Sequence, residues 1–306
     1  MICSLHQLAR EIYYFYNALP DPFCLDDTNV KFIQESIRAG KYKLKPFSLE
    51  LYSKNDSPLL CTFHVFSLEG FPNPKFYLQP TEGDILVLAA LARMLNLKIL
   101  ESSIFIDQSC GFQMHIHSFF NDLEGSGEVS NLIYLDLSPS LLTLPCSQEY
   151  VHSKLSPIVD DRDVLNFLWS FITTPVVFNN EILEFAIPPV GLITDVLFNF
   201  FLDELDRTFI TFIPEKAYSR YINACFIRNS DRILIENILS SFGLSAKMIS
   251  LFPGCPPINC FGHSIRVRED LFMKRSEKGS SYTPLRLKVI YFDDSLMLPR
   301  KGSLAT

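Results

Sequence analysis

The pattern of apolar and polar residues predicts helices that alternate irregularly with strands. Apolar residues recur at helical spacing over residues 3–20, 26–38, 83–97, 163–172, 195–209 and 233–242. Short apolar or alternating runs predict strands over residues 42–47, 59–68, 132–137, 218–228, 259–267 and 285–292, and a hairpin over 176–185 that turns at Asn179 and Asn180. Helices mixed with hairpins, without regular βαβ units, indicate an α+β fold.

Composition places the chain among folded, globular proteins. Of its 306 residues, 48% are hydrophobic and 20% are charged, which is enough for one large domain or two smaller ones with a sizeable core. The formal net charge is −7. Because proteins that bind a nucleic-acid backbone usually carry an excess of positive charge, this chain needs a local basic patch if it binds RNA.

The cysteines and the apolar runs indicate an intracellular protein without a membrane span. None of the eight cysteines forms a C-x-x-C pair and no secretory leader is visible, so we expect reduced thiols. The apolar run closest to a membrane span, residues 85–95, is interrupted by Arg93 and is too short to cross a bilayer.

Three groups of polar residues are candidate metal sites, but each has a simpler interpretation. The pairs His115 and His117, and Cys255 and Cys260, lack further ligands at metal-binding spacing, so we interpret neither pair as a site. Residues 160–163, Asp-Asp-Arg-Asp, are typical of a helix start, where carboxylates interact favourably with the helix dipole. We therefore predict no metal centre in these places.

Several short segments follow one another in a recognisable order. Residues 37–46 (IRAGKYKLKP) are close to I-x-x-G-x-Y-x-F-x-P, residues 107–113 (DQSCGFQ) to D-x-S-Y-G-F-R, residues 187–206 to V-P-Q-G-S-x-x-S-P-x-L-x-N-x-x-L-x-x-L-D, residues 219–226 (SRYINACF) to R-Y-x-D-D-F, and residues 261–265 (FGHSI) to F-L-G-F-x-I. A short apolar strand ends at Asp136. Over residues 31–292 the chain thus resembles the reverse transcriptases of the group II intron maturase family, in a degenerate, organellar form.

The resemblance implies a right-hand polymerase architecture. Residues 1–125 would form a fingers-like region, and residues 126–270 a palm-like region with an antiparallel sheet backed by helices. Residues 271–306 would begin a truncated thumb, with no endonuclease or long maturase region after it.

The resemblance also implies that catalysis is lost. The family holds two Mg²⁺ ions with one aspartate at the end of the first palm strand and two in a hairpin turn. Here Asp136 remains, but the turn offers Asn223 and Ala224. We therefore expect no cofactor, and Mg²⁺ at most weakly at Asp136. A literal Y-x-D-D sequence does occur, ending in Asp293 and Asp294, but it lies after the palm-closing segment, where the family begins its thumb.

One basic stretch is the candidate RNA-binding site. It contains Arg38, Lys41, Lys43 and Lys45, with Tyr42 among them as a possible stacking ring. In the family this region touches RNA. The alternative is that these cations lie on a solvent-exposed edge of the protein and bind nothing.

Two functions from different classes follow from these expectations. The first is an RNA-binding, maturase-type factor that assists organellar intron splicing without copying RNA. The second is a structural or assembly subunit of a larger organellar ribonucleoprotein, such as the mitochondrial ribosome. For both functions, the partners of the protein would be intron or ribosomal RNA, or ribonucleoprotein proteins. An active RNA-directed DNA polymerase is a distant third function. The 27 phenylalanines favour a mitochondrial or other organellar location, and an organellar gene.

Overall fold

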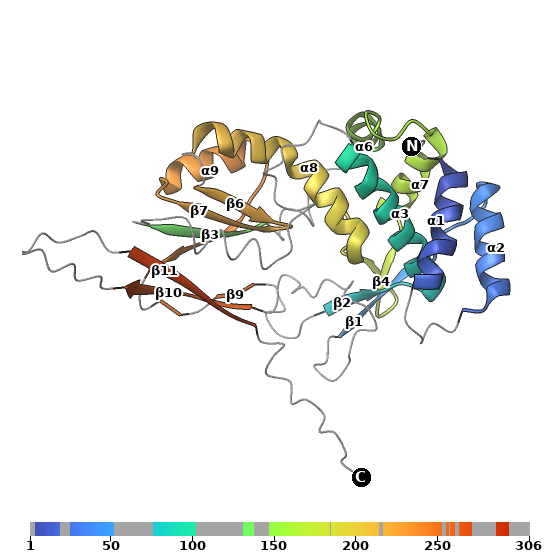
Figure 1. Ribbon diagram of the computed structural model, residues 1–306, viewed down its shortest axis with the longest axis horizontal. Helices are drawn as coiled ribbons and strands as arrows, with labels where there is room; N and C mark the ends of the chain where they lie inside the picture. The colour runs from blue at the N-terminus through green and yellow to red at the C-terminus, as the bar shows by residue number, and fades with distance from the viewer. Residues whose placement is uncertain are drawn as a thin grey trace, which may run out of the picture. The chain divides into compact units, whose positions relative to one another are not determined.

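The computed structural model divides the chain into two compact units, shown in Figure 1. Unit 1 comprises Met1–Asp107 and Ser140–Asp203, and unit 2 comprises Gln108–Pro139 and Glu204–Thr306. The structure describes residues 4–18, 25–51, 76–101, 131–137, 147–183, 185–213, 217–252, 255–256, 258–260, 263–270 and 286–293. The expected fingers, palm and thumb boundaries near residues 125 and 270 stay predictions.

Unit 1 combines helices with a mixed four-stranded sheet. Its helices are α1 (Leu5–Ala18), α2 (Asp27–Arg38), α3 (Glu82–Glu101), α6 (Gln148–Leu155), α7 (Arg162–Ile172) and the first part of α8 (Gly191–Phe212). Its sheet has the order β2-β1-β4-β5, with β1 (Phe47–Leu51), β2 (Phe76–Gln79), β4 (Val176–Phe178) and β5 (Glu181–Leu183). Strand β1 pairs antiparallel with β2 and parallel with β4. The hairpin predicted at Asn179 and Asn180 is confirmed, since both residues have positive φ in the turn between β4 and β5.

Side-chain caps explain where several of these helices begin. The Asp26 carboxylate accepts a hydrogen bond from the Asn29 amide at 2.7 Å and so caps α2. The Asp161 carboxylate accepts one from the Asp163 amide at 2.8 Å and caps α7. The acidic run at residues 160–163 is therefore a helix start, as interpreted. Gly40, with a φ of 63°, follows the end of α2.

The core of unit 1 is built around α3. Its residues are apolar on all sides, and Leu86, Leu91 and Leu95 are fully buried. Helix α1 packs against both α2 and α3. A helix that is apolar all round is expected to be enclosed by other elements, and α3 is enclosed in this way.

Unit 2 contains an antiparallel four-stranded sheet, as the sequence predicts for the palm-like region. The order is β6-β7-β3-β8, with β3 (Leu132–Asp136), β6 (Tyr218–Tyr221), β7 (Ala224–Arg228) and β8 (Lys247–Leu251). Helix α9 (Arg232–Ser241) also belongs to this unit. Strand β7 is buried along its whole length. Together, the two units confirm the predicted α+β class.

A second sheet in unit 2 corrects one expectation. The single strand predicted over 259–267 is instead two antiparallel strands, β9 (Ile258–Cys260) and β10 (His263–Asp270), because the chain reverses and pairs Cys260 with His263. The apolar pattern continues across this reversal, so it carries no sign of it. Strand β11 (Arg286–Asp293) completes the order β11-β10-β9.

Of the other predicted strands, one begins at a different residue in the structure and one falls where the structure is not described. Residues 41–46 form no regular strand, and only Phe47 of the predicted 42–47 segment enters β1. The strand expected over 59–68 lies outside the described residues. Among the residues that the structure describes, no helix is long and apolar enough to span a bilayer.

Candidate functional site

The hairpin between β6 and β7 brings three of the predicted site residues together. Asp136, the last residue of β3, is in register with Ala224 on β7. The Asn223 side-chain amide donates a hydrogen bond to Asp136 Oδ1 at 3.2 Å. The backbone of the turn is also tied to β3, because the Leu137 amide donates to the Asn223 carbonyl at 2.8 Å. The turn therefore presents its side chains to the carboxylate at the end of β3.

This arrangement does not fit a pair of catalytic Mg²⁺ ions. Mg²⁺ requires oxygen ligands in near-octahedral geometry. The nitrogen of the Asn223 amide faces the Asp136 carboxylate, because two oxygens in that position would repel each other, and Ala224 has no ligand atom. Across the described segments, no group of three or more His, Cys, Asp or Glu side chains is arranged to hold a metal ion. A single carboxylate that is hydrogen-bonded to an amide cannot bind two metal ions in the arrangement that nucleotidyl transfer needs.

Asp293, the first residue of the alternative aspartate pair, belongs to another sheet of unit 2. Asp293 is the last residue of β11 and is in register with His263 on β10. That sheet, β11-β10-β9, is separate from the sheet that contains Asp136. Asp294 lies outside the described residues.

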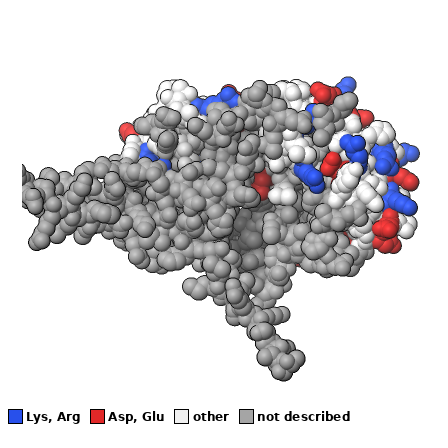
Figure 2. Space-filling model, in the orientation of Figure 1, with Lys and Arg blue, Asp and Glu red and all other residues white. Residues whose placement is uncertain are grey.

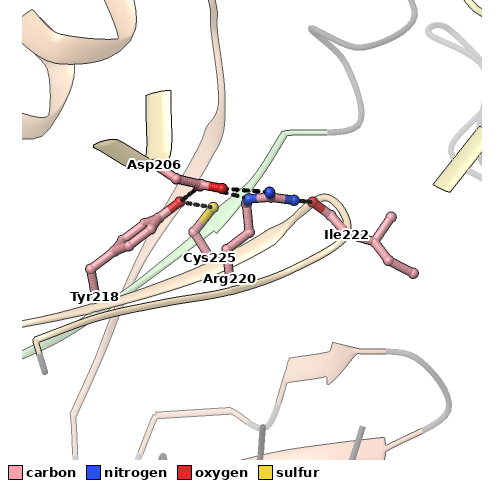
Figure 3. A network of polar contacts seen from close by, with 5 residues as sticks. All are labelled: Asp206, Tyr218, Arg220, Ile222 and Cys225. Atoms are coloured by element: carbon pink, nitrogen blue, oxygen red, sulfur yellow. Dashed lines mark hydrogen bonds and ion pairs between the residues drawn. The ribbon is translucent and has the colours of Figure 1, made fainter. Parts of the chain in front are cut away.

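Behind the turn lies a buried polar cluster, the Asp206 network, formed by Asp206, Tyr218, Arg220 and Cys225 (Figure 3). The Arg220 guanidinium donates to both oxygens of the Asp206 carboxylate, from Nε at 2.8 Å and from Nη2 at 2.6 Å. The Tyr218 hydroxyl donates to Asp206 Oδ1 at 2.5 Å and lies 3.8 Å from the Cys225 sulfur. Both charged residues are fully buried, so this is a bidentate ion pair shielded from solvent.

The network reaches the turn directly. Arg220 Nη1 donates to the Ile222 carbonyl at 2.6 Å. Ile222 has a φ of 53°, a left-handed conformation that β-branched residues rarely adopt. Such a conformation is retained when surrounding contacts over-determine it. The buried guanidinium thus holds the strained residue that precedes Asn223.

Burial and charge set the protonation of this network. Burial raises the pKa of Tyr218 well above its ordinary value, and the neighbouring Asp206 carboxylate raises it further. Burial by itself lowers the pKa of Arg220, but the Asp206 carboxylate outweighs this effect and raises the pKa overall. Tyr218 is therefore neutral and Arg220 is charged at all ordinary pH values.

The Asp206 network is the part of the site that sequence reasoning missed. Asp206 and Arg220 occur in two different segments of the resembled pattern, and the sequence does not connect them as partners. A buried charge generally needs an opposite one, but the sequence does not show which charges are buried. Several charged residues occur in both segments: Asp195, Asp203, Glu204, Asp206 and Arg207 in α8, and Arg220 and Arg228 in the β6–β7 hairpin.

In unit 1, residues 41–46 form a basic loop that is fixed by one buried carboxylate. Asp84, near the start of α3, accepts hydrogen bonds from the Tyr42 hydroxyl at 2.9 Å, the Thr81 hydroxyl at 2.6 Å and the Lys45 amide at 3.4 Å. The Ser36 carbonyl on α2 accepts hydrogen bonds from the amides of residues 41 and 42. The backbone of the loop is therefore held from both sides.

The cations of this stretch point to solvent. Arg38, Lys41, Lys43 and Lys45 are exposed. Within the described part of the chain none of them forms an ion pair. Figure 2 shows Lys and Arg side chains gathered on the side of the view where α2 lies. Four exposed cations close together in sequence form a local positive patch on an acidic chain.

Tyr42 differs from its basic neighbours. It is half-buried, its ring centroid lies 6.4 Å from that of Phe167, and its hydroxyl donates to Asp84. Burial raises the pKa of Tyr42 above its ordinary value, and Asp84 raises it further. The geometry gives Tyr42 the role of an anchor for the loop, and its use as a stacking ring stays a prediction.

Just before α8, Pro189 and Val190 stand where the resembled pattern V-P-Q-G-S has glutamine and glycine. The Thr194 hydroxyl donates to the Pro188 carbonyl at 2.7 Å and accepts from the Val190 amide at 2.8 Å. Beside it lies a cavity of about 20 Å³ lined by apolar side chains, among them Pro80, Ile85 and Val190. A space of this volume holds about one water molecule.

The other candidate ligands are not assembled into a site. His115 and His117 lie outside the described residues. Cys255 is half-buried, and Cys260 belongs to β9.

The comparisons with known proteins find distant similarity among solved structures. No protein family and no curated protein matches the sequence. Among solved structures, the telomerase from Candida albicans, in complex with the TWJ fragment of telomeric RNA, superposes with a TM-score of 0.46 and 9% sequence identity. The match covers 85% of this chain and 49% of that chain, so this chain spans about half the length of the telomerase chain it matches.

Proposed function

We propose that the chain is a reverse transcriptase-like protein with fingers and palm that has lost nucleotidyl transfer and binds RNA as a maturase-type factor in organellar intron splicing. The observation that carries this proposal is the basic loop fixed by Asp84. A loop whose backbone is held in place by a buried carboxylate, and whose lysines remain free, is suited to a polyanion because little order has to be gained on binding.

The site at Asp136 supports the loss of polymerase activity. The Asn223 amide occupies the side of the Asp136 carboxylate that faces the turn, and Ala224 contributes no ligand. The protein should therefore neither need Mg²⁺ for its fold nor copy RNA. What it keeps of the ancestral function is the ability to bind RNA.

The RNA contact would be mainly electrostatic. Each phosphate neutralised on a single strand adds about −0.7 to the slope of log affinity against log salt. Lys41, Lys43 and Lys45 alternate along the loop, so three phosphate contacts are available. Replacing these three residues should make the slope shallower by about 2.

The test compares two triple variants of the full chain. One carries Lys41→Gln, Lys43→Gln and Lys45→Gln, and the control carries Arg207→Gln, Arg232→Gln and Lys247→Gln, which removes the same charge from exposed positions in unit 2. Affinity for a fluorescent single-stranded RNA is measured by anisotropy over a range of salt. A shallower slope in the loop variant only supports the proposal, and equal slopes in both variants contradict it.

A second candidate function is favoured by the overall charge. A net charge of −7 suits a protein that is held in a ribonucleoprotein by other proteins. Crosslinking followed by sequencing of the bound RNA, performed in the native organelle, separates the two functions. Intron RNA supports the maturase-type role, ribosomal RNA supports the assembly role, and the absence of bound RNA contradicts the first proposal.

A further inference from the structure

Strands β10 and β11 of unit 2 form a two-stranded ribbon over most of their length. The two strands pair in antiparallel register along all 8 residues of each, from His263 with Asp293 to Asp270 with Arg286. The third strand, β9, pairs only with residues 263–265 of β10. Within the described part of the chain, the rest of β10 is therefore paired with β11 alone (Figure 1).

One face of this ribbon is apolar in its middle. Successive residues of a strand belong to opposite faces, and residues that are directly opposite in antiparallel register share a face. Ile265 is fully buried, and its partners in register are Ile258 on β9 and Tyr291 on β11. The next pair on the same face is Val267 with Val289. The buried residue Ile265 thus belongs to an apolar face.

The opposite face carries three cations that have no opposite charge in register. They are Arg266 and Arg268 of β10 and Lys288 of β11, and we call them the ribbon cations. Arg268 is directly opposite Lys288, and Arg266 is opposite Ile290. Residues two apart on a strand are separated by about 7 Å, and the Cβ atoms of directly opposite residues by about 5 Å. The three ribbon cations are therefore close neighbours.

Pairing within the sheet does not account for this arrangement. Like charges directly opposite each other destabilise two paired strands, so Arg268 opposite Lys288 weakens the ribbon. A fourth cation on the same face shows the stabilising alternative, because Arg286 is opposite Asp270. The ribbon cations lie within about one Debye length of each other at 0.1 M salt, so salt screens their repulsion only in part. An anion bound across them would relieve it.

We infer that the ribbon cations are a second phosphate-binding site, which contacts RNA in unit 2 independently of the basic loop in unit 1. This inference rests on the proposed RNA binding and adds a second contact to it. Arginine and lysine form strong, charge-assisted hydrogen bonds with phosphate. Because every nucleotide carries a charge, one RNA strand can neutralise three neighbouring cations at once. A protein partner would need three carboxylates in a matching arrangement.

The test uses variants of the full chain and a fluorescent single-stranded RNA. The triple variant carries Arg266→Gln, Arg268→Gln and Lys288→Gln. The single variant Lys288→Gln is compared with its matched control Arg286→Gln, which removes the same charge from the same strand and face but from a position opposite Asp270. RNA affinity is measured by anisotropy over a range of salt, and thermal unfolding of the free protein is measured at low salt.

The triple variant should lose three phosphate contacts. Each contact adds about −0.7 to the salt slope, so the slope of the triple variant should be shallower by about 2. Between about 50 and 200 mM salt, the unaltered chain should then lose on the order of 20-fold more affinity than the triple variant.

The single variants should differ in both measurements. Lys288→Gln should bind RNA with a shallower slope, by about 0.7, and should unfold at a higher temperature in low salt, because the like-charge pair is gone. Arg286→Gln should leave the RNA slope nearly unchanged and should unfold at a lower temperature, because Asp270 loses the opposite charge across the ribbon.

Two results would overturn the inference. One is an unchanged salt slope in the triple variant, and the other is an equal change of slope in Lys288→Gln and Arg286→Gln. An unchanged slope together with a more stable Lys288→Gln variant would assign the ribbon cations to an acidic protein partner instead. Because the single variants alter one charge each, they keep the test decisive if the triple variant does not fold.

Failure of the proposed function would look different. If the unaltered chain does not bind RNA, the RNA-binding proposal itself is wrong. If the triple lysine variant of the basic loop has a shallower slope and the ribbon variant does not, only the second site is wrong. If the ribbon variant has a shallower slope and the lysine variant does not, the ribbon cations bind RNA and the role of the basic loop is wrong.

Discussion

Two buried carboxylates, one in each unit, fix a loop in contrasting ways. Asp84 in unit 1 accepts only from neutral donors, namely two hydroxyls and a backbone amide, and the lysines of the loop that it holds stay in solvent. Asp206 in unit 2 pairs with a buried guanidinium, and that guanidinium holds the turn before Asn223. In the first arrangement the positive charges of the loop are exposed to solvent. In the second, the buried carboxylate and guanidinium neutralise each other.

The contrast separates a turn that is held by contacts within the chain from a loop whose cations are exposed. The turn at Asn223 retains a strained conformation and its buried support, although the residues it presents cannot bind two metals. The basic loop retains cations that contribute nothing to the fold through ion pairs within the described residues. The exposed cations of the fixed loop support the proposed RNA contact, whereas the turn is held by contacts within the chain.

The largest effect is expected from breaking the buried ion pair. Arg220→Met leaves the Asp206 carboxylate buried without its charged partner and frees the turn at Ile222. Such a loss costs about 3–5 kcal/mol of folding free energy. Urea unfolding of the variant, compared with the unaltered chain, measures it.

A double variant that removes both charges shows whether the loss in Arg220→Met comes from the carboxylate that is left unpaired. Asp206→Leu combined with Arg220→Met removes both charges from the same place, and much of the stability should return because no unpaired charge remains. A single variant that unfolds within about 1 kcal/mol of the unaltered chain would show that the network is not the support described here.

The next largest effect is expected at Asp84. Asp84→Ala leaves the Tyr42 and Thr81 hydroxyls without this acceptor, at a cost of about 1–3 kcal/mol. RNA affinity should also fall although no lysine is changed, because the loop is no longer fixed. Removing a negative charge alone would raise the affinity, so a fall identifies positioning.

Glu50→Ala is the matched control for Asp84. Glu50 is an exposed carboxylate that accepts hydrogen bonds from Tyr77 and Ser48, and it does not touch the loop. Its loss should leave both stability and RNA affinity nearly unchanged. An RNA affinity that rises equally in both variants would mean that Asp84 acts only through its charge.

A smaller effect is expected at alkaline pH, where both networks contain a tyrosine with a raised pKa. In the unfolded chain Tyr42 and Tyr218 ionise near their ordinary value of 10.0, but in the folded chain they stay protonated to higher pH. The stability that these two protonated tyrosines contribute to the fold is therefore complete below pH 10 and is lost as the pH rises above 10. Each group should add a decline of about 1.4 kcal/mol per pH unit.

Unfolding in urea at a series of pH values from neutral to strongly alkaline measures this decline. Tyr42→Phe and Tyr218→Phe should each make it shallower. Tyr13→Phe, an exposed tyrosine on α1, is the control and should leave the slope as it is. Equal slopes in all three variants would contradict the assignment of the raised pKa to these two residues.

The sequence predicts the local features of the fold better than the site. Helical periodicity predicts α1, α2, α3, α7 and α9, and the Asn-Asn turn predicts the β4–β5 hairpin, because these depend on neighbouring residues. The meeting of Asp136 with Asn223 follows from the order of the reverse transcriptase-like segments. No local pattern connects Asp206 on α8 with Arg220 on β6, because only the tertiary packing joins them. The exposure of Phe32 is likewise invisible in a pattern that counts it as apolar.

The most direct test of the central claim is the substitution Asn223→Asp, studied by thermal unfolding with EDTA and with millimolar Mg²⁺. Asn229→Asp, at an exposed residue just after β7, controls for the added charge.

If the Asn223 amide has replaced a metal-dependent arrangement, the unaltered chain unfolds at the same temperature in both solutions. The Asn223→Asp variant is then destabilised in EDTA by about 1 kcal/mol through repulsion with Asp136, and Mg²⁺ restores it. If Mg²⁺ stabilises the unaltered chain as much as the variant, Asp136 already binds a metal ion. The proposal that this site is catalytically inactive and independent of metal is then wrong.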